Sequence, residues 1–79
     1  MDYSNYGILN MLQDVQRQLW GKTSVFINIY QDTDMEKYLS ACIFDKDNRA
    51  KCFNFHNDES EEEHKDTYIR FYDIVKQFV

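Results

Sequence analysis

A dense run of carboxylates is the feature of this sequence with the clearest chemistry. Five acidic residues fall within six positions: Asp58, Glu59, Glu61, Glu62 and Glu63. The helix dipole favours acidic side chains in the first turn of a helix, typically by about 0.3–1 kcal/mol each. One or two carboxylates would serve that purpose, whereas a larger number also repel one another. Two interpretations follow: a solvated helix start, or a rigid row of carboxylates that imitates nucleic-acid phosphates and attracts a basic protein.

A second acidic group and two tyrosines lie in the middle of the chain. Asp32, Asp34 and Glu36 fall in or beside a polar connection between two predicted strands, and Tyr30 and Tyr38 stand on either side of them. Tyrosine is enriched among the residues that dominate protein–protein binding energy. We therefore add the three acids as partner-binding candidates, with the two tyrosines as aromatic anchors.

A metal site would need the histidines to converge with the carboxylates. His56, Asp58, Glu62 and His64 are close in sequence. The two histidines are eight residues apart and straddle a predicted strand-to-helix junction, unlike the pair four residues apart with which one helical face binds zinc. The sequence therefore predicts no metal site and no cofactor.

Nucleophilic catalysis would need an activated serine or cysteine beside an oriented base. Cys42 and Cys52 fall in the middle of predicted strands, and Gly7 and Gly21 are too far apart to form a phosphate-binding loop. Acid–base catalysis would need a pocket that shifts carboxylate pKa values, and a domain of this size rarely holds one. We expect no enzymatic activity. We interpret the cysteines as reduced, packed thiols, with a reversible cross-strand disulfide as the alternative.

The overall charge argues against several classes of partner. The chain has 79 residues, with 9 Lys and Arg against 14 Asp and Glu, for a net charge of −5. Binding to nucleic acids and to anionic membranes depends on clusters of cations, which this sequence lacks. It also has no apolar run of the roughly 18 residues that a membrane span needs, and no signal-peptide pattern at its start. We expect a cytoplasmic protein.

The first element that must position these residues is an amphipathic helix. Ile8, Leu12, Val15 and Leu19 recur at steps of four, three and four, which predicts a helix over residues ~4–20. Gly21 suits the left-handed conformation that often ends a helix.

Three strands are predicted next, over residues ~23–31, ~36–45 and ~49–56, because β-branched and aromatic residues alternate with polar ones there. A three-residue loop over 46–48 would join the second and third strands. That loop pairs Ala41 with Phe53 and Cys42 with Cys52, on opposite faces of the sheet. A loop one residue shorter or longer would break both pairings.

A second helix is predicted over residues ~60–78. It begins with the S-x-x-E spacing of a capping box at Ser60 and Glu63 and continues with apolar residues at helical spacing. The whole chain is thus one small α+β domain, residues 1–79, in the order helix-strand-strand-strand-helix. We expect two layers, with both helices on one face of a three-stranded antiparallel sheet.

The element order is similar to that of the double-stranded RNA-binding domain, over nearly the whole chain but in order alone. That family has lysines at the start of its second helix to bind phosphates, whereas this chain has Ser60, Glu61, Glu62 and Glu63. In size, charge and element order the chain resembles small acidic inhibitors from phages and mobile elements, including some anti-CRISPR and anti-restriction proteins. Such a likeness concerns the fold and is no match of functional residues.

These observations favour a non-enzymatic protein that inhibits or regulates a basic, nucleic-acid-handling protein by presenting carboxylates where phosphates would lie. The partner would be a protein, with no direct nucleic acid and no membrane, and the chain would be a monomer or a homodimer. A toxin-immunity protein and a homodimeric interaction module are the alternatives.

Overall fold

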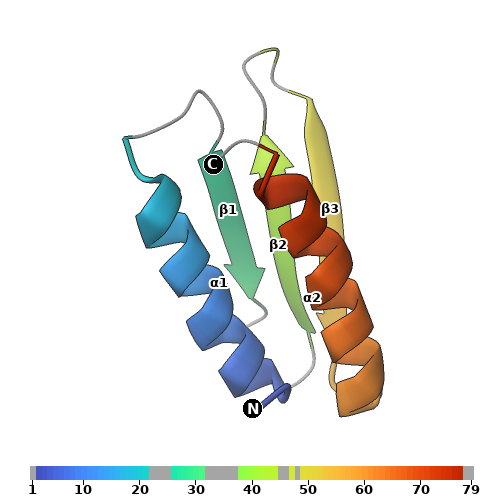
Figure 1. Ribbon diagram of the computed structural model, residues 1–79. Coiled ribbons are helices and arrows are strands. Elements are labelled where there is room, and N and C mark those ends of the chain that lie inside the picture. The colour runs from blue at the N-terminus through green and yellow to red at the C-terminus, as the bar shows by residue number, and fades with distance from the viewer. Residues whose placement is uncertain (1, 22–25, 32–37, 45–46, 48, 78–79) are drawn as a thin grey trace.

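The computed structural model describes residues 2–21, 26–31, 38–44, 47 and 49–77. In these residues the chain forms five elements in the predicted order, which confirms the α+β class (Figure 1). They are α1 (Asn5–Leu19), β1 (Phe26–Gln31), β2 (Tyr38–Phe44), β3 (Ala50–His56) and α2 (Glu61–Val75). The predicted loop over 46–48 and the outer ends of the predicted strands fall wholly or partly outside the described residues.

The strands form one antiparallel sheet in the order β1-β2-β3. Both helices lie on the same face of this sheet, with α1 against β1 and α2 against β3 (Figure 1). The predicted two-layer arrangement is therefore confirmed.

The predicted register of the hairpin is confirmed as well. Ala41 pairs with Phe53, and Cys42 pairs with Cys52. Because side chains alternate between the faces of a strand, this register places Leu39, Ala41 and Ile43 toward the helices, where all three are buried.

The apolar core lies between the helices and the covered face of the sheet. The stripe predicted for α1 is buried along its whole length: Ile8, Leu12, Val15 and Leu19. From the other elements come Ile27, Leu39, Ala41, Ile43, Phe53, Phe55, Phe71 and Val75. Burying a large apolar side chain contributes about 1.5–3 kcal/mol, so this cluster is the main source of stability.

Both helices begin at a serine cap. The Ser4 hydroxyl accepts a hydrogen bond from the Gly7 amide (3.3 Å). At α2 the predicted capping box is present: the Ser60 hydroxyl accepts from the Glu63 amide (3.2 Å), and the Glu63 carboxylate accepts from the Ser60 amide (3.3 Å). A cap lies just outside the helix it starts, so α2 begins one residue later than predicted. It also ends earlier, at Val75.

The sheet face away from the helices, here called the open face, carries no covering element among the described residues (Figure 1). Its described side chains are Phe26, Asn28, Tyr30, Ser40, Cys42, Phe44, Ala50, Cys52, Asn54 and His56. The rings of Phe26 and Phe44 stack there, with centroids 5.4 Å apart. An antiparallel sheet with one face uncovered is a stable arrangement, and the described residues of this face include no Asp, Glu, Lys or Arg.

The prediction of reduced cysteines is wrong. Cys42 and Cys52 form a disulfide between directly opposed positions of β2 and β3, with Cα atoms 4.0 Å apart. Two cysteines are too few for a disulfide scaffold, but the strand register, rather than their number, brings them together. In the chain-entropy account, closing so short a loop contributes about 2–3 kcal/mol.

Candidate protein-binding site at the acidic end

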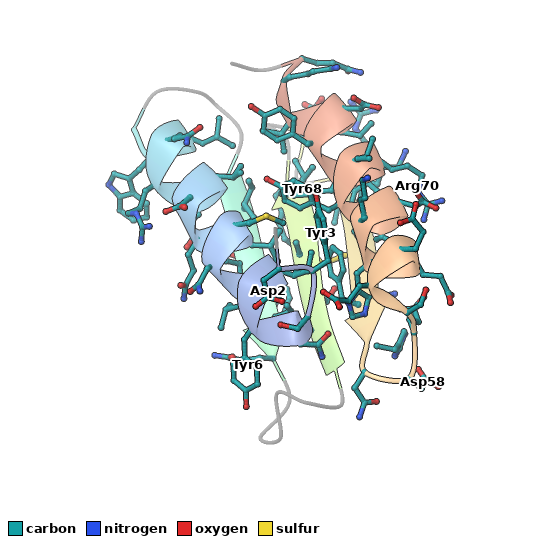
Figure 2. The ribbon with its side chains drawn as sticks, turned by 60° about the horizontal axis from the view of Figure 1, so that its bottom comes forward. Asp2, Tyr3, Tyr6, Asp58, Tyr68 and Arg70 are labelled. Atoms are coloured by element: carbon teal, nitrogen blue, oxygen red, sulfur yellow. A yellow bond between two sulfur atoms is a disulfide. The ribbon has the colours of Figure 1, made fainter. Side chains whose placement is uncertain are left out.

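The predicted carboxylate run and the N-terminal segment meet at one end of the molecule. The main-chain amide of Tyr3 donates to the Glu61 carboxylate at 3.0 Å, which holds the N-terminal segment against the start of α2. The two segments are seen together in Figure 2, where Asp2 and Asp58 are labelled. The name acidic end is used here for six residues: Asp2, Asp58, Glu59, Glu61, Glu62 and Glu63.

A tight turn positions the run. After β3 ends at His56, the Glu59 amide donates to the His56 carbonyl at 3.2 Å. In the other direction, the His56 amide donates to the Glu59 carboxylate at 2.8 Å. Ser60, which caps α2, follows this turn directly. The connection between β3 and α2 is therefore short and is held by hydrogen bonds.

Three carboxylates of the acidic end have structural roles. Glu59, Glu61 and Glu63 each accept a hydrogen bond from a main-chain amide, of His56, Tyr3 and Ser60 respectively. Asp58 and Glu62 are exposed and form no such bond among the described residues. Of the five carboxylates in the predicted run, three therefore stabilise the fold. Only Asp58 and Glu62 are left without such a role among the described residues.

The acidic end lacks the ion pairs that other described parts of the chain contain. Within the described part of the chain, no Lys or Arg forms an ion pair with any of the six carboxylates. The described ion pairs are Arg17–Asp14, Arg49–Asp47 and Lys76–Asp73. They lie in the last half of α1, in the β2–β3 connection and at the end of α2, all toward the opposite end of the molecule (Figure 1).

Asp2 is held in its ionised form by its neighbour. The Ser4 side chain and the Ser4 amide donate to its carboxylate, the amide at 2.8 Å. These hydrogen bonds lower the pKa of Asp2 below its usual value. The acidic end therefore gains a carboxylate that stays charged as the pH falls.

The buried side chain of His64 contacts both the N-terminal segment and the end of β3. His64 is 3% exposed. Its Nδ1 lies 2.7 Å from the Tyr3 carbonyl and its Nε2 lies 2.7 Å from the His56 carbonyl. Carbonyl oxygens only accept, so each of these contacts is a hydrogen bond when the ring nitrogen that makes it carries a hydrogen.

The same contacts bear on metal binding. Both ring nitrogens of His64 face carbonyl oxygens, so neither is presented to an ion. Across the described residues, no group of three or more His, Cys, Asp or Glu side chains is placed to hold a metal.

A shallow pocket of about 390 Å³ opens beside this histidine. Its lining residues are Ser4, Asn5, Tyr6, Asn57, Glu59, Glu61 and His64. Tyr6 is 53% exposed at its rim, and Figure 2 shows its ring pointing away from the helices. Carboxylates beside an aromatic ring and amide groups form a surface suited to a Lys or Arg side chain of a partner protein.

The other predicted binding residues do not join this site. Tyr30 is 48% exposed but stands on the open face, where its hydroxyl accepts from the Asn28 side-chain amide at 3.3 Å. Tyr38 begins β2, and its side chain lies outside what the structure describes. The acids Asp32, Asp34 and Glu36 also lie outside it, so the prediction for them stays open.

Sequence reasoning missed Asp2, Tyr6 and His64 as parts of this end. Only tertiary contacts bring the N-terminal segment to α2, and no local sequence pattern predicts these contacts. The position of His64 did carry a signal, because it shares the buried face of α2 with Thr67 and Phe71. A polar ring on such a face needs hydrogen-bond partners.

No protein-family model matches this chain, and neither a curated protein nor a solved structure is similar enough to count as a match. No helix within the described residues is long and apolar enough to cross a membrane.

Proposed function

We propose that this chain is a non-enzymatic acidic binding protein that inhibits or regulates a basic, nucleic-acid-handling protein. Its acidic end occupies the partner's nucleic-acid site, with carboxylates where phosphates would lie. An inhibitor of a defence or nucleic-acid-processing protein, of the kind that phages and mobile elements encode, has this chemistry.

The observation that carries the proposal is the separation of charge along the molecule. Six carboxylates gather at one end, and within the described residues none of them has a Lys or Arg partner, whereas the described ion pairs lie toward the other end. A protein with such a field attracts a basic partner from a distance and orients it before contact.

The local structure supports the same proposal because it makes the charges rigid. Hydrogen bonds from main-chain amides fix Glu59, Glu61 and Glu63. Rigid charges lose little side-chain entropy on binding. Beside these fixed charges, the carboxylates of Asp58 and Glu62 accept no hydrogen bond from the described residues, and they remain available to the partner's Lys and Arg side chains.

The test is affinity capture of the tagged chain from a nuclease-treated host lysate at low and moderate salt. We expect a basic protein whose recovery falls as salt rises. The double variant Asp58→Lys/Glu62→Lys should reduce the affinity for that protein by about tenfold or more, because it reverses charge without breaking an internal hydrogen bond.

The matched control is Asp14→Lys/Asp73→Lys, which changes the net charge equally at the opposite end. Its affinity for the captured protein should stay within about twofold of the wild type. Equal losses of affinity from both double variants would mean that net charge alone drives the association. An unchanged affinity in Asp58→Lys/Glu62→Lys would show that the acidic end is not part of the interface.

A homodimeric interaction module is the second candidate, and the open face favours it. None of its described residues is an Asp or Glu, although the chain carries 14 of them. Phe26 on that face is 52% exposed. Two copies therefore meet there without repulsion between carboxylates. Light scattering at millimolar concentration distinguishes the candidates, since a monomeric mass contradicts self-association.

A further inference from the structure

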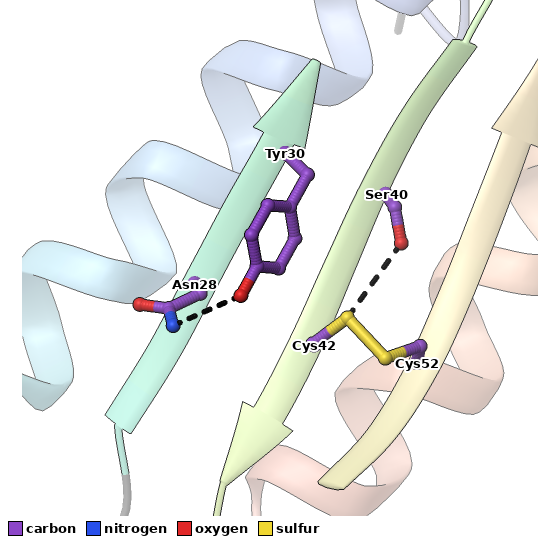
Figure 3. The surroundings of a disulfide bond; sticks show 5 residues. All are labelled: Asn28, Tyr30, Ser40, Cys42 and Cys52. Atoms are coloured by element: carbon purple, nitrogen blue, oxygen red, sulfur yellow. Dashed lines mark hydrogen bonds between the residues drawn. A yellow bond between two sulfur atoms is a disulfide. The ribbon is translucent and has the colours of Figure 1, made fainter. Parts of the chain in front are cut away.

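The two cysteines of the disulfide differ in their place in the sheet and in their exposure. Cys42 lies in the central strand, with β1 on one side and β3 on the other, and is 5% exposed. Cys52 lies in β3, at the edge of the sheet, and is exposed. Figure 3 shows the bond spanning β2 and β3 on the open face.

Thiol–disulfide exchange depends on which sulfur an incoming thiolate can reach. The attacking sulfur approaches along the line of the S–S bond, from the side opposite the leaving sulfur. On the Cys52 side lies β3, the edge strand, with no further described strand beyond it. Behind Cys42 the line leads toward β1, where Asn28 and Tyr30 stand (Figure 3), and Asn28 is the direct cross-strand neighbour of Cys42. We therefore expect an incoming thiolate to reach Cys52 more readily than Cys42.

The leaving sulfur has a hydrogen-bond donor beside it. The Ser40 hydroxyl lies 3.7 Å from Cys42 Sγ, and Ser40 is 2% exposed. A disulfide sulfur carries no hydrogen, so the hydroxyl is the donor. When Cys42 leaves as a thiolate, this neutral contact becomes a stronger, charge-assisted one.

From this geometry we propose that the Cys42–Cys52 bond is a site of thiol–disulfide exchange, opened by a dithiol reductant that attacks Cys52. The reductant's thiolate forms a bond to Cys52 Sγ while the Cys42–Cys52 bond breaks, and Cys42 Sγ leaves with the electron pair. The second thiol of the reductant then attacks the mixed disulfide, which releases Cys52 as a thiolate. Both thiolates take up protons; this chain gains two electrons and the reductant becomes a disulfide.

The proposed exchange is independent of the acidic end. It acts on the open face and removes the covalent link between β2 and β3, whereas the partner-binding carboxylates lie at the start of α2. A reductant thereby changes the sheet without altering the charges at the acidic end.

The first test traps the intermediate with a monothiol. The native protein is incubated with reduced glutathione, quenched with acid, alkylated and mapped by mass spectrometry. We expect the glutathione adduct on Cys52 to exceed that on Cys42 by about tenfold. In concentrated guanidinium, where both sulfurs are accessible, the preference should disappear.

Two variants test the groups around Cys42. Ser40→Ala should slow the reduction of the folded protein by dithiothreitol by about threefold or more, while Ser40→Thr, which keeps the hydroxyl, should retain the rate. Asn28→Ala should raise the share of adduct on Cys42 because it clears the line of attack. Circular dichroism verifies that each variant is folded.

Equal adducts on the two cysteines of the native protein would overturn the proposal. So would a reduction rate that matches the rate of global unfolding, because the bond would then open only when the sheet does. An unchanged rate in Ser40→Ala would remove the hydroxyl from the mechanism.

Discussion

Carboxylates at the two ends of the molecule are stabilised in different ways. Toward the far end, three aspartates form exposed ion pairs with nearby cations: Asp14–Arg17, Asp47–Arg49 and Asp73–Lys76. At the acidic end, Glu59, Glu61 and Glu63 instead accept hydrogen bonds from main-chain amides. A cation cancels the charge that it pairs with, whereas an amide fixes a carboxylate and leaves its net charge intact.

The difference explains how one run of acids serves both fold and charge. The amide bonds connect the N-terminal segment, the β3–α2 turn and the cap of α2, so the acidic end is a structural joint as well as a charged surface. The far-end pairs connect residues only two or three positions apart and hold no distant segments together. Mutations should therefore cost more stability at the acidic end than at the far end.

The largest loss is expected from His64→Phe. The variant keeps a ring beside Phe55, whose centroid lies 5.8 Å from that of His64, but leaves the carbonyls of Tyr3 and His56 without their donors. Each unsatisfied buried group costs about 1–3 kcal/mol, so urea unfolding should show a loss of about 2–4 kcal/mol. Glu62→Gln, an exposed change at the same end, is the control and should stay within about 0.5 kcal/mol. A loss no larger than that of the control would show that the contacts of His64 with Tyr3 and His56 do not stabilise the fold.

A somewhat smaller loss is expected from Gly7→Ala. A Cβ atom at Gly7 would lie 2.1 Å from the Asp2 carbonyl oxygen, so the N-terminal segment would have to move off α1. Alanine improves helix propensity by about 0.5–1 kcal/mol, yet overpacking costs about 1–3 kcal/mol, and a net loss of about 1–2 kcal/mol should appear in urea unfolding. Asn10→Ala, on the exposed side of α1, is the control for a gain in helix propensity without a steric clash. A net gain at Gly7 would show that this segment does not stabilise the fold.

The two helix caps offer a comparison of intermediate size. Ser60→Ala should lower the free energy of unfolding by about 1–2 kcal/mol, and Ser4→Ala by about 0.5–1 kcal/mol. The reason is that Ser60 takes part in a reciprocal box with Glu63, whereas the first turn of α1 contains no acidic residue. Thermal unfolding of the two variants side by side checks this order, and the reverse order would count against the reciprocal bond.

The smallest effect is expected at the far end, at alkaline pH. A hydrogen bond to Asp73 raises the pKa of Lys76 above its ordinary value of 10.5. A raised folded-state pKa contributes stability that is fully present below pH 10.5 and is lost as the pH rises through the folded value. Asp73→Asn should remove this contribution, as measured by unfolding from pH 9, where the contribution is complete, to pH values above 10.5, where it is lost. Both side chains are largely exposed, so a large change in slope would contradict the view that far-end pairs are weak.

The sequence predicted the fold well because its signals are local. Alternation in the strands, the four-three-four spacing of the α1 stripe and the S-x-x-E pattern at Ser60 each depend on neighbouring residues. The hairpin register followed from the faces of Ala41 and Phe53. Residue-level patterns of this kind fix elements and their order.

The candidate site was harder to predict because its parts are distant in sequence. Tyr3 and Glu61 are 58 positions apart and Tyr3 and His64 are 61 apart. No periodicity encodes either contact. For the same reason the sequence overestimated the surplus of carboxylates, since the amides that Glu59 and Glu61 accept from became visible only in the folded chain. The disulfide is the opposite case: the hairpin register predicts that Cys42 lies opposite Cys52, and a low number of cysteines does not prevent two opposed ones from bonding.

The most direct test of the central claim is competition for the captured partner. A fluorescent DNA duplex is bound to that protein, and its anisotropy is followed as the acidic chain is added. Mimicry predicts that the chain releases the DNA completely, and that Asp58→Lys/Glu62→Lys needs about tenfold more protein to do so. A ternary complex of chain, partner and DNA, with the anisotropy undiminished, would contradict the account.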